Sequence, residues 1–128
     1  MLKKNRRQVP LRTHDGQQSY ILLQQGDVPS DLFSVMWVEM APGSGQQPHQ
    51  HGPEQAYIII RGGGRMRVGH EEDEVNEGDI IYVPSNAVHT VQNLGPGPLV
   101  YLTVAAPAFN LASLYGTGEL SSNPPRVQ

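Results

Sequence analysis

The chain has 128 residues with 14 Gly, 11 Pro and no Cys, and its 9 Lys and Arg against 12 Asp and Glu give a net charge of −3. This length suits one domain, and the missing Cys excludes disulfides, thiolate metal ligands and a thiol nucleophile. No apolar run of 18 residues is present and none follows the basic N-terminus, so we expect neither a membrane span nor a secretory signal. A cytoplasmic protein is the resulting expectation.

The N-terminus is basic: the first twelve residues carry five bases and no acid, whereas the remainder carries four bases and twelve acids. Such an arm can bind nucleic acid, lie against the acidic remainder of the chain or against a partner subunit, or stay mobile. No recognition helix or aromatic platform accompanies it, so we expect no nucleic-acid partner. We expect residues 1–18 to form this arm, residues 19–106 a barrel, and residues 107–128 a C-terminal extension or tail.

Short apolar runs bounded by Gly and Pro follow one another along the chain, and no long segment has the 3.6-residue period of a helix. Runs of this kind predict strands. We expect strands at residues 19–23, 33–40, 55–61, 65–68, 80–83, 88–93 and 99–105. A short helical turn is expected within residues 109–115, and the acidic run 71–74 is expected to be a solvated turn. The series is typical of an all-β barrel or sandwich.

Two of these runs are apolar at consecutive positions, Ile58 to Ile60 and Ile80 to Ile81, so their strands present apolar side chains on both faces. One face fills a barrel interior, and the other needs a second sheet or a second subunit to cover it. We therefore expect a homodimer.

Three of the five histidines lie in two short segments that together predict a metal site. His49, His51 and Gln55 share one parity, so on an extended chain their side chains point to the same side. His89 follows 38 residues after His51. Imidazoles with an oxygen ligand suit iron, nickel, copper or zinc. His14 and His70 lie in polar, turn-like stretches and are expected at the surface.

The first of these segments resembles the first motif of the cupin superfamily, G-x5-H-x-H-x3,4-E-x6-G. Its positions are filled by Gly43, His49, His51, Gln55 and Gly62, and the one departure is Gln55 in place of the usual glutamate.

The second segment resembles the second cupin motif, G-x5-P-x-G-x2-H-x3-N. Gly78, Pro84, His89 and Asn93 match, and Asn86 replaces the usual glycine. That glycine often needs a positive φ, and Asn tolerates such a position best among the other residues. The two motifs occur in order with the correct spacing over residues 43–93, and the flanking runs fit the same barrel, so the resemblance covers most of the chain.

The resemblance implies an all-β double-stranded β-helix, the jelly-roll or cupin barrel. It also implies a divalent transition metal, Fe, Mn, Ni or Zn, held by His49, His51, Gln55 and His89. A metal-free polar pocket lined by the same histidines is the alternative. Three neutral imidazoles on inner strands are costly to bury without a partner, and a cation supplies one.

The residue at the glutamate position decides the charge of this site. A shift by one residue would bring Glu54 inward, but it would also turn the following strand inside out. Gln55 keeps the six residues to Gly62 and the parity of the histidines, so we assign Gln55 as the ligand. An amide leaves the metal its whole +2 charge, which favours an anionic or chelating substrate. Tyr57 shares this parity and is our candidate for hydrogen-bonding or proton-transfer catalysis, although a tyrosine packed in a barrel more often has a structural role.

Three functions fit a barrel of this kind, each with a small-molecule partner. The numbers of known cupins favour a dioxygenase-type oxidoreductase acting on a small oxygen-rich compound. A non-redox lyase or isomerase of a small carbonyl or carboxylate compound is favoured by Gln55. A binding or sensing module without turnover is the third, because a fold does not decide its function.

Overall fold

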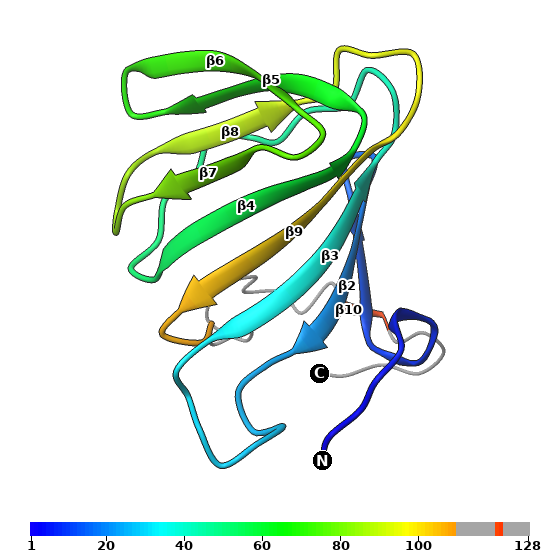
Figure 1. The fold of residues 1–128 in the computed structure, drawn as a ribbon, viewed down its shortest axis with the longest axis vertical. Coiled ribbons are helices and arrows are strands. Elements are labelled where there is room, and N and C mark those ends of the chain that lie inside the picture. The colour runs from blue at the N-terminus through cyan, green and yellow to red at the C-terminus, as the bar shows by residue number, and fades with distance from the viewer. Residues whose placement is uncertain (110–119, 122–128) are drawn as a thin grey trace.

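The structure is a computed structural model that describes residues 1–109 and 120–121. It is an all-β barrel of two antiparallel sheets, drawn in Figure 1. The larger sheet has the order β10-β1-β2-β3-β9-β4-β7, and the smaller one has the order β6-β5-β8. The large sheet contains β1 (Leu11–His14), β2 (Gln17–Leu23), β3 (Ser34–Met40), β4 (Glu54–Arg61), β7 (Ile80–Val83), β9 (Leu99–Ala106) and β10 (Leu120–Ser121); the small sheet contains β5 (Gly63–Val68), β6 (Glu71–Asn76) and β8 (His89–Gln92).

The double-stranded β-helix predicted from the sequence is confirmed, and each of the seven expected runs overlaps a strand. In the described part of the chain the single helical element is the 3₁₀ turn η1 (Arg6–Gln8). No described helix has the length and apolar character needed to cross a membrane. The helical turn expected within 109–115 falls, apart from residue 109, outside the described residues.

The expectation of a solvated turn at residues 71–74 was wrong, because these residues begin β6. Their side chains are exposed, yet the backbone pairs with β5. The register sets Glu72 opposite Arg67 and Glu74 opposite Arg65. Opposite charges on facing residues stabilise a strand pair, so an acidic run that looks like a loop in isolation becomes a strand beside a basic one.

Both ends of the chain contribute to the large sheet. Leu11–His14 form β1, which pairs with β2 along its whole length, although we had assigned this range to a basic arm. Leu120–Ser121 form β10 on the other side of β1 and belong to the expected C-terminal extension. Part of the predicted N-terminal arm (1–18) and part of the predicted C-terminal extension (107–128) therefore lie within the large sheet.

The turns that the two cupin-like motifs predict have the backbone that the motifs require. Asn86 has a φ of 63°, as expected for a residue that replaces glycine. Gly62 has a φ of 81°, and a Cβ there would lie 2.4 Å from the carbonyl oxygen of Pro98. A side chain at position 62 is therefore excluded by conformation and by space.

The hydrophobic core joins the inner faces of the two sheets. Met66, Val75 and Val91 of the small sheet belong to the same buried cluster as Ile59 and Tyr101 of the large sheet. Along β3 buried and partly buried residues alternate strictly, which is the pattern of a strand with one face in the core.

The outer face of the large sheet carries two apolar rows. Because directly opposed residues lie on one face, the strand registers place these residues in line across the sheet. The first row contains Tyr20, Trp37, Leu102, Ile58 and Ile80; the second contains Val35, Val104, Ala56 and Tyr82. We call these residues the outer rows. Ile80 is 69% exposed and Tyr82 is 59% exposed, so the β7 end of the rows is open.

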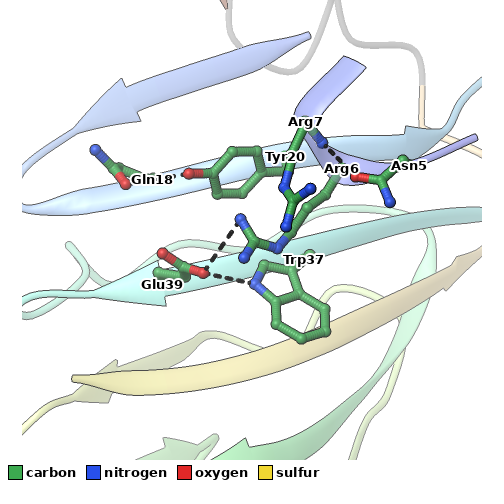
Figure 2. Close-up of polar contacts among 7 residues, drawn as sticks. All are labelled: Asn5, Arg6, Arg7, Gln18, Tyr20, Trp37 and Glu39. Atoms are coloured by element: carbon green, nitrogen blue, oxygen red, sulfur yellow. Dashed lines mark hydrogen bonds and ion pairs between the residues drawn. The ribbon is translucent and has the colours of Figure 1, made fainter. Parts of the chain in front are cut away.

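The basic N-terminal segment covers the opposite end of the outer rows. Figure 2 shows the Arg6 guanidinium packed against Tyr20 and Trp37, with its Cζ 5.3 Å and 5.4 Å from their ring centroids. Glu39 accepts a hydrogen bond from Trp37 Nε1 at 2.9 Å and pairs with Arg6 at 3.8 Å. Lys4 also forms an ion pair with Asp27 of the same chain. The segment therefore lies against its own acidic body.

Candidate metal centre

The three histidines predicted to bind metal come together at one end of the barrel. His89 lies in β8, and His49 and His51 lie in the segment between β3 and β4. The backbones of His49 and His89 exchange two hydrogen bonds, of 3.1 Å and 2.9 Å, which tie that segment to β8. One ring nitrogen from each histidine lies within 4.8 Å of those of the other two. This is the spacing of a possible three-imidazole metal site.

Each of the three imidazoles is oriented by a backbone carbonyl that lies 2.9 Å from its Nδ1. The acceptors are the carbonyl oxygens of Gln47, Pro53 and Ala87, each two residues from its histidine. A carbonyl only accepts, so Nδ1 carries the hydrogen and Nε2 keeps its lone pair in the neutral ring. Carbonyls that orient the ring in this way are typical partners of metal-ligating histidines.

Burial keeps two of these rings neutral. Desolvation by burial, together with the neighbouring His49 and His51, lowers the pKa of His89 from 6.5 to about 4. The pKa of His49 is lowered in the same direction, first by burial and then by the charges of His51 and Arg12. A neutral imidazole is the form that binds metal.

His89 Nε2 has no hydrogen-bond partner among the described residues, although it is buried. A buried acceptor without a donor costs free energy comparable to a lost hydrogen bond. Since Nδ1 already donates to a carbonyl, a cation at Nε2 satisfies the ring. The residues present therefore fit a bound metal ion.

Gln55 lies where the sequence parity predicted, buried on the inner face of β4. Its Oε1 is 3.1 Å from Nε2 of His51. Both atoms are acceptors when His51 donates through Nδ1, so they need a cation between them or a rotated amide that donates. Glu54 points to the outer side, where it accepts a hydrogen bond of 2.9 Å from the Tyr82 hydroxyl. The role of Gln55 as a ligand stays a prediction.

Tyr57 is 1% exposed and lies beside the histidines, with its ring centroid 6.0 Å from that of His89. It stacks on Tyr101 at a centroid distance of 4.9 Å. The amide of Gln46 donates to Tyr101 at 3.0 Å and reaches the Tyr57 hydroxyl at 3.5 Å. Tyr57 therefore belongs to a polar network next to the metal site, and its catalytic role stays a prediction.

These groups border a cavity of about 260 Å³ inside the barrel. Its polar lining consists of amides, hydroxyls, imidazoles and one guanidinium, and no Asp or Glu is among the described residues that line it. The described lining comprises Arg12, His14, Gln17, Ser19, Met36, Val38, Gln46, Gln47, His49, Gln50, His51, Gln55, Tyr57, Tyr101, Thr103 and Phe109. A neutral to positive cavity of this kind suits a small, oxygen-rich ligand.

Several lining residues were not predicted from the sequence. His14, which we expected at the surface, is half-buried and lines the cavity, whereas His70 is exposed as expected. Phe109 packs edge-on against His51 with the centroids 4.8 Å apart. Arg12 and His14 lie on either side of the exposed Thr13 in β1, and the sequence Leu11–His14 has no apolar alternation that marks their side as inward.

Comparison with known proteins agrees with this geometry. The chain is 36% identical over 69 residues to the uncharacterized protein MJ1618 of Methanocaldococcus jannaschii, over 53% of this chain and 55% of that protein. It is 31% identical over 51 residues to the dimethylsulfoniopropionate lyase DddW of Ruegeria pomeroyi, over 40% of this chain and 34% of the lyase. The chain thus spans about half or less of these two curated relatives.

A solved structure shares the fold across most of the chain. The predicted oxalate decarboxylase of Thermotoga maritima superimposes with a TM-score of 0.74 at 21% identity, and the match covers 84% of this chain and 99% of that protein. The cupin domain family matches residues 36–105, more than half of the chain, including both histidine segments. The chain therefore belongs to the cupin family.

Proposed function

We propose that this cupin is a metal-dependent enzyme that acts on a small, oxygen-rich carboxylate by lyase or isomerase chemistry. The observation that carries the proposal is the neutral donor set. His89 clusters with His49 and His51, which line a cavity together with Gln55, and the described lining of that cavity has no carboxylate. These four residues would hold a divalent transition metal, Fe, Mn, Ni or Zn. A metal with neutral ligands supplies Lewis acidity toward a carbonyl or carboxylate oxygen.

The chain's own groups supply proton transfer and exclude water. The Tyr57 hydroxyl lies in the network around Gln46, which orients the phenol toward the cavity side of β4. We assign Tyr57 the transfer of a proton to or from the bound compound. Phe109, Met36 and Val38 form the apolar part of the lining and limit the water that reaches it.

The two named relatives support this class of substrate. Dimethylsulfoniopropionate and oxalate are both small carboxylates, and both proteins are named for bond-breaking reactions without an oxygenase step. The same three imidazoles also suit a redox metal, so a dioxygenase-type oxidoreductase is the alternative function, and oxygen uptake during turnover would identify it. A binding or sensing module without turnover uses the same cavity.

Metal exchange separates the three functions. We would load the purified protein with zinc or with ferrous iron and assay a panel of small carboxylates with and without oxygen. Turnover by the zinc form without oxygen supports the proposal, because zinc has no redox chemistry. Oxygen uptake that requires iron would establish the dioxygenase instead. Carboxylate binding without any turnover would establish a binding module.

Tyr57→Phe tests the proton-transfer role in the same assay. Loss of a positioned acid or base lowers kcat by about 100-fold or more, while metal content stays unchanged. Tyr101→Phe removes the hydroxyl of the stacked partner and serves as the matched control. Equal activity of wild type and Tyr57→Phe would assign Tyr57 a packing role.

We also propose that the outer rows bind a second copy of the chain. They contain no charged side chain, so the same face of a second copy, related by a two-fold axis, places apolar against apolar without stranding a charge. Arg6 and Glu39, which pair with each other, lie at the margin. Light scattering should then give twice the 14.0 kDa of one chain.

We also propose a cytoplasmic location for the protein, and cell fractionation tests it.

A further inference from the structure

Arg12 faces the interior of the barrel. In the pairing of β1 with β2 it lies directly opposite Ser19, which is buried on the inner face. Directly opposed residues point to one side of a sheet, so the Arg12 side chain projects inward with Ser19. Both residues line the cavity that His49 and His51 border from the other side.

Arg12 gives this cavity its one permanent side-chain charge among the described lining residues. Arg12 lies in the same cavity lining as His49, His51 and Gln55. A divalent cation held by neutral ligands adds a second positive centre to the same space. Two positive centres without a lining carboxylate attract a ligand that brings the negative charge itself.

We propose that Arg12 binds the carboxylate group of the ligand and thereby sets the specificity of the cavity for small organic acids. The assignment rests on the proposed function, because it concerns the ligand of the same site. A guanidinium has five N–H donors in a planar fork that matches a carboxylate with two parallel hydrogen bonds. This number of donors lets Arg12 bind a carboxylate while it keeps a contact to its own chain.

The surroundings of Arg12 suit a small ligand. The cavity volume of about 260 Å³ corresponds to about nine water molecules at their share of liquid volume. Gln17 and Ser19 of β2 lie next to Arg12 in the lining and offer further amide and hydroxyl groups. The cavity therefore accommodates a compact acid with one end at Arg12 and an oxygen toward the histidines.

Calorimetric titration with malonate and with its uncharged analogue malonamide tests the assignment. We expect the zinc-loaded full-length protein to bind malonate at least about tenfold more tightly than malonamide, because a charge-assisted bidentate pair is lost with the amide. Arg12→Gln should remove most of the preference that the metal-free protein retains and leave zinc content unchanged. Arg65→Gln, on β5 and outside the cavity lining, should retain it.

Removing the metal separates this inference from the proposed function. The metal-free wild type should still prefer malonate, because Arg12 is unchanged. If the preference disappears with the metal, or survives in a folded, metal-free Arg12→Gln, the assignment is overturned. If Arg12→Gln does not fold, Arg12→Lys decides: it keeps the charge but not the fork, so a malonate affinity equal to wild type overturns the bidentate contact. Failure to bind zinc, with an intact Arg12-dependent preference, would overturn the metal-dependent function alone.

Discussion

The two faces of the large sheet differ in the side chains that they carry besides the hydrophobic core of the inner face. The inner face offers polar side chains such as Gln17, Gln55 and Thr103 to the cavity, while the outer face carries Trp37 and Ile58 in line with other apolar residues. The same strands contribute to both faces, because side chains alternate along a strand. We propose that the inner polar groups form a binding site and that the outer apolar groups form a contact surface for a second copy.

The difference between the two faces predicts which property of the protein a substitution on each face should change. A buried polar group is costly without a partner, so the inner amides and imidazoles are explained by what they bind. An open apolar patch is costly in water, so the outer rows are explained by what covers them. Substitutions on each face should therefore change one property and leave the other intact.

The largest effect is expected from removing an inner-face ligand. His89→Ala takes away the ring whose Nε2 has no described partner, and we expect the zinc affinity to fall by about 100-fold or more. Competition with a chelating dye measures this change. His70→Ala, which removes an exposed imidazole, is the control and should bind zinc as the wild type does. Unchanged affinity in His89→Ala would exclude His89 as a ligand.

A charge on the outer face should break the dimer without disturbing the metal. Ile80→Lys places an ammonium at the open end of the outer rows, and we expect the dimer affinity to fall by about 30-fold or more. Analytical ultracentrifugation over a concentration series measures it. Leu94→Lys changes another exposed apolar residue, one outside the rows, and should leave the dimer intact. If Leu94→Lys dissociates the dimer and Ile80→Lys does not, the interface lies elsewhere.

Mild acid should weaken the inner face of the metal-free protein. The pKa of His89 is lowered to about 4 in the folded chain and returns to about 6.5 on unfolding, so the unfolded state binds more protons between these values. Stability is therefore full above about pH 7 and is lost as the pH falls toward 4. Urea unfolding at about pH 7 and about pH 5 should differ by about 2 kcal/mol from this ring. No difference between the two pH values would contradict a buried neutral His89.

The smallest effect should come from changing the charge of the donor set. Gln55→Glu brings a carboxylate to the inner face beside His51, and we expect zinc to bind about tenfold more tightly. Glu54→Gln, one residue away on the outer face, is the matched control and should leave the zinc affinity unchanged. Weaker zinc binding in Glu54→Gln would show that Glu54, and not Gln55, coordinates the metal.

Much of the site was predictable because its signals are local. The spacing of His49, His51 and Gln55 within seven residues sets their shared side, and the structure brings His49 and His51 together with His89. The burial of Gln55 and the exposure of Glu54 follow from the same parity. The positive φ of Asn86 was predictable from the residue that it replaces.

Other features depend on how a strand pairs with its neighbour, which the segment by itself does not show. The exposed Glu72 and Glu74 belong to a strand only because Arg67 and Arg65 lie opposite them. Arg12 lies in a segment whose charge suggested an arm, and its inward direction follows from its pairing with Ser19.

The sequence by itself determined the cupin barrel and the three histidines, because two motifs with regular spacing specify turns and side-chain parity within single segments. Only the tertiary structure decided that Arg12 faces the metal site and that the outer rows run straight across five strands. The inward side of Arg12 depends on the register of β1 with β2. The outer rows depend on the register between strands such as β3 and β9, which lie some sixty residues apart in the chain. Register is a property of paired strands, and a single segment does not contain it.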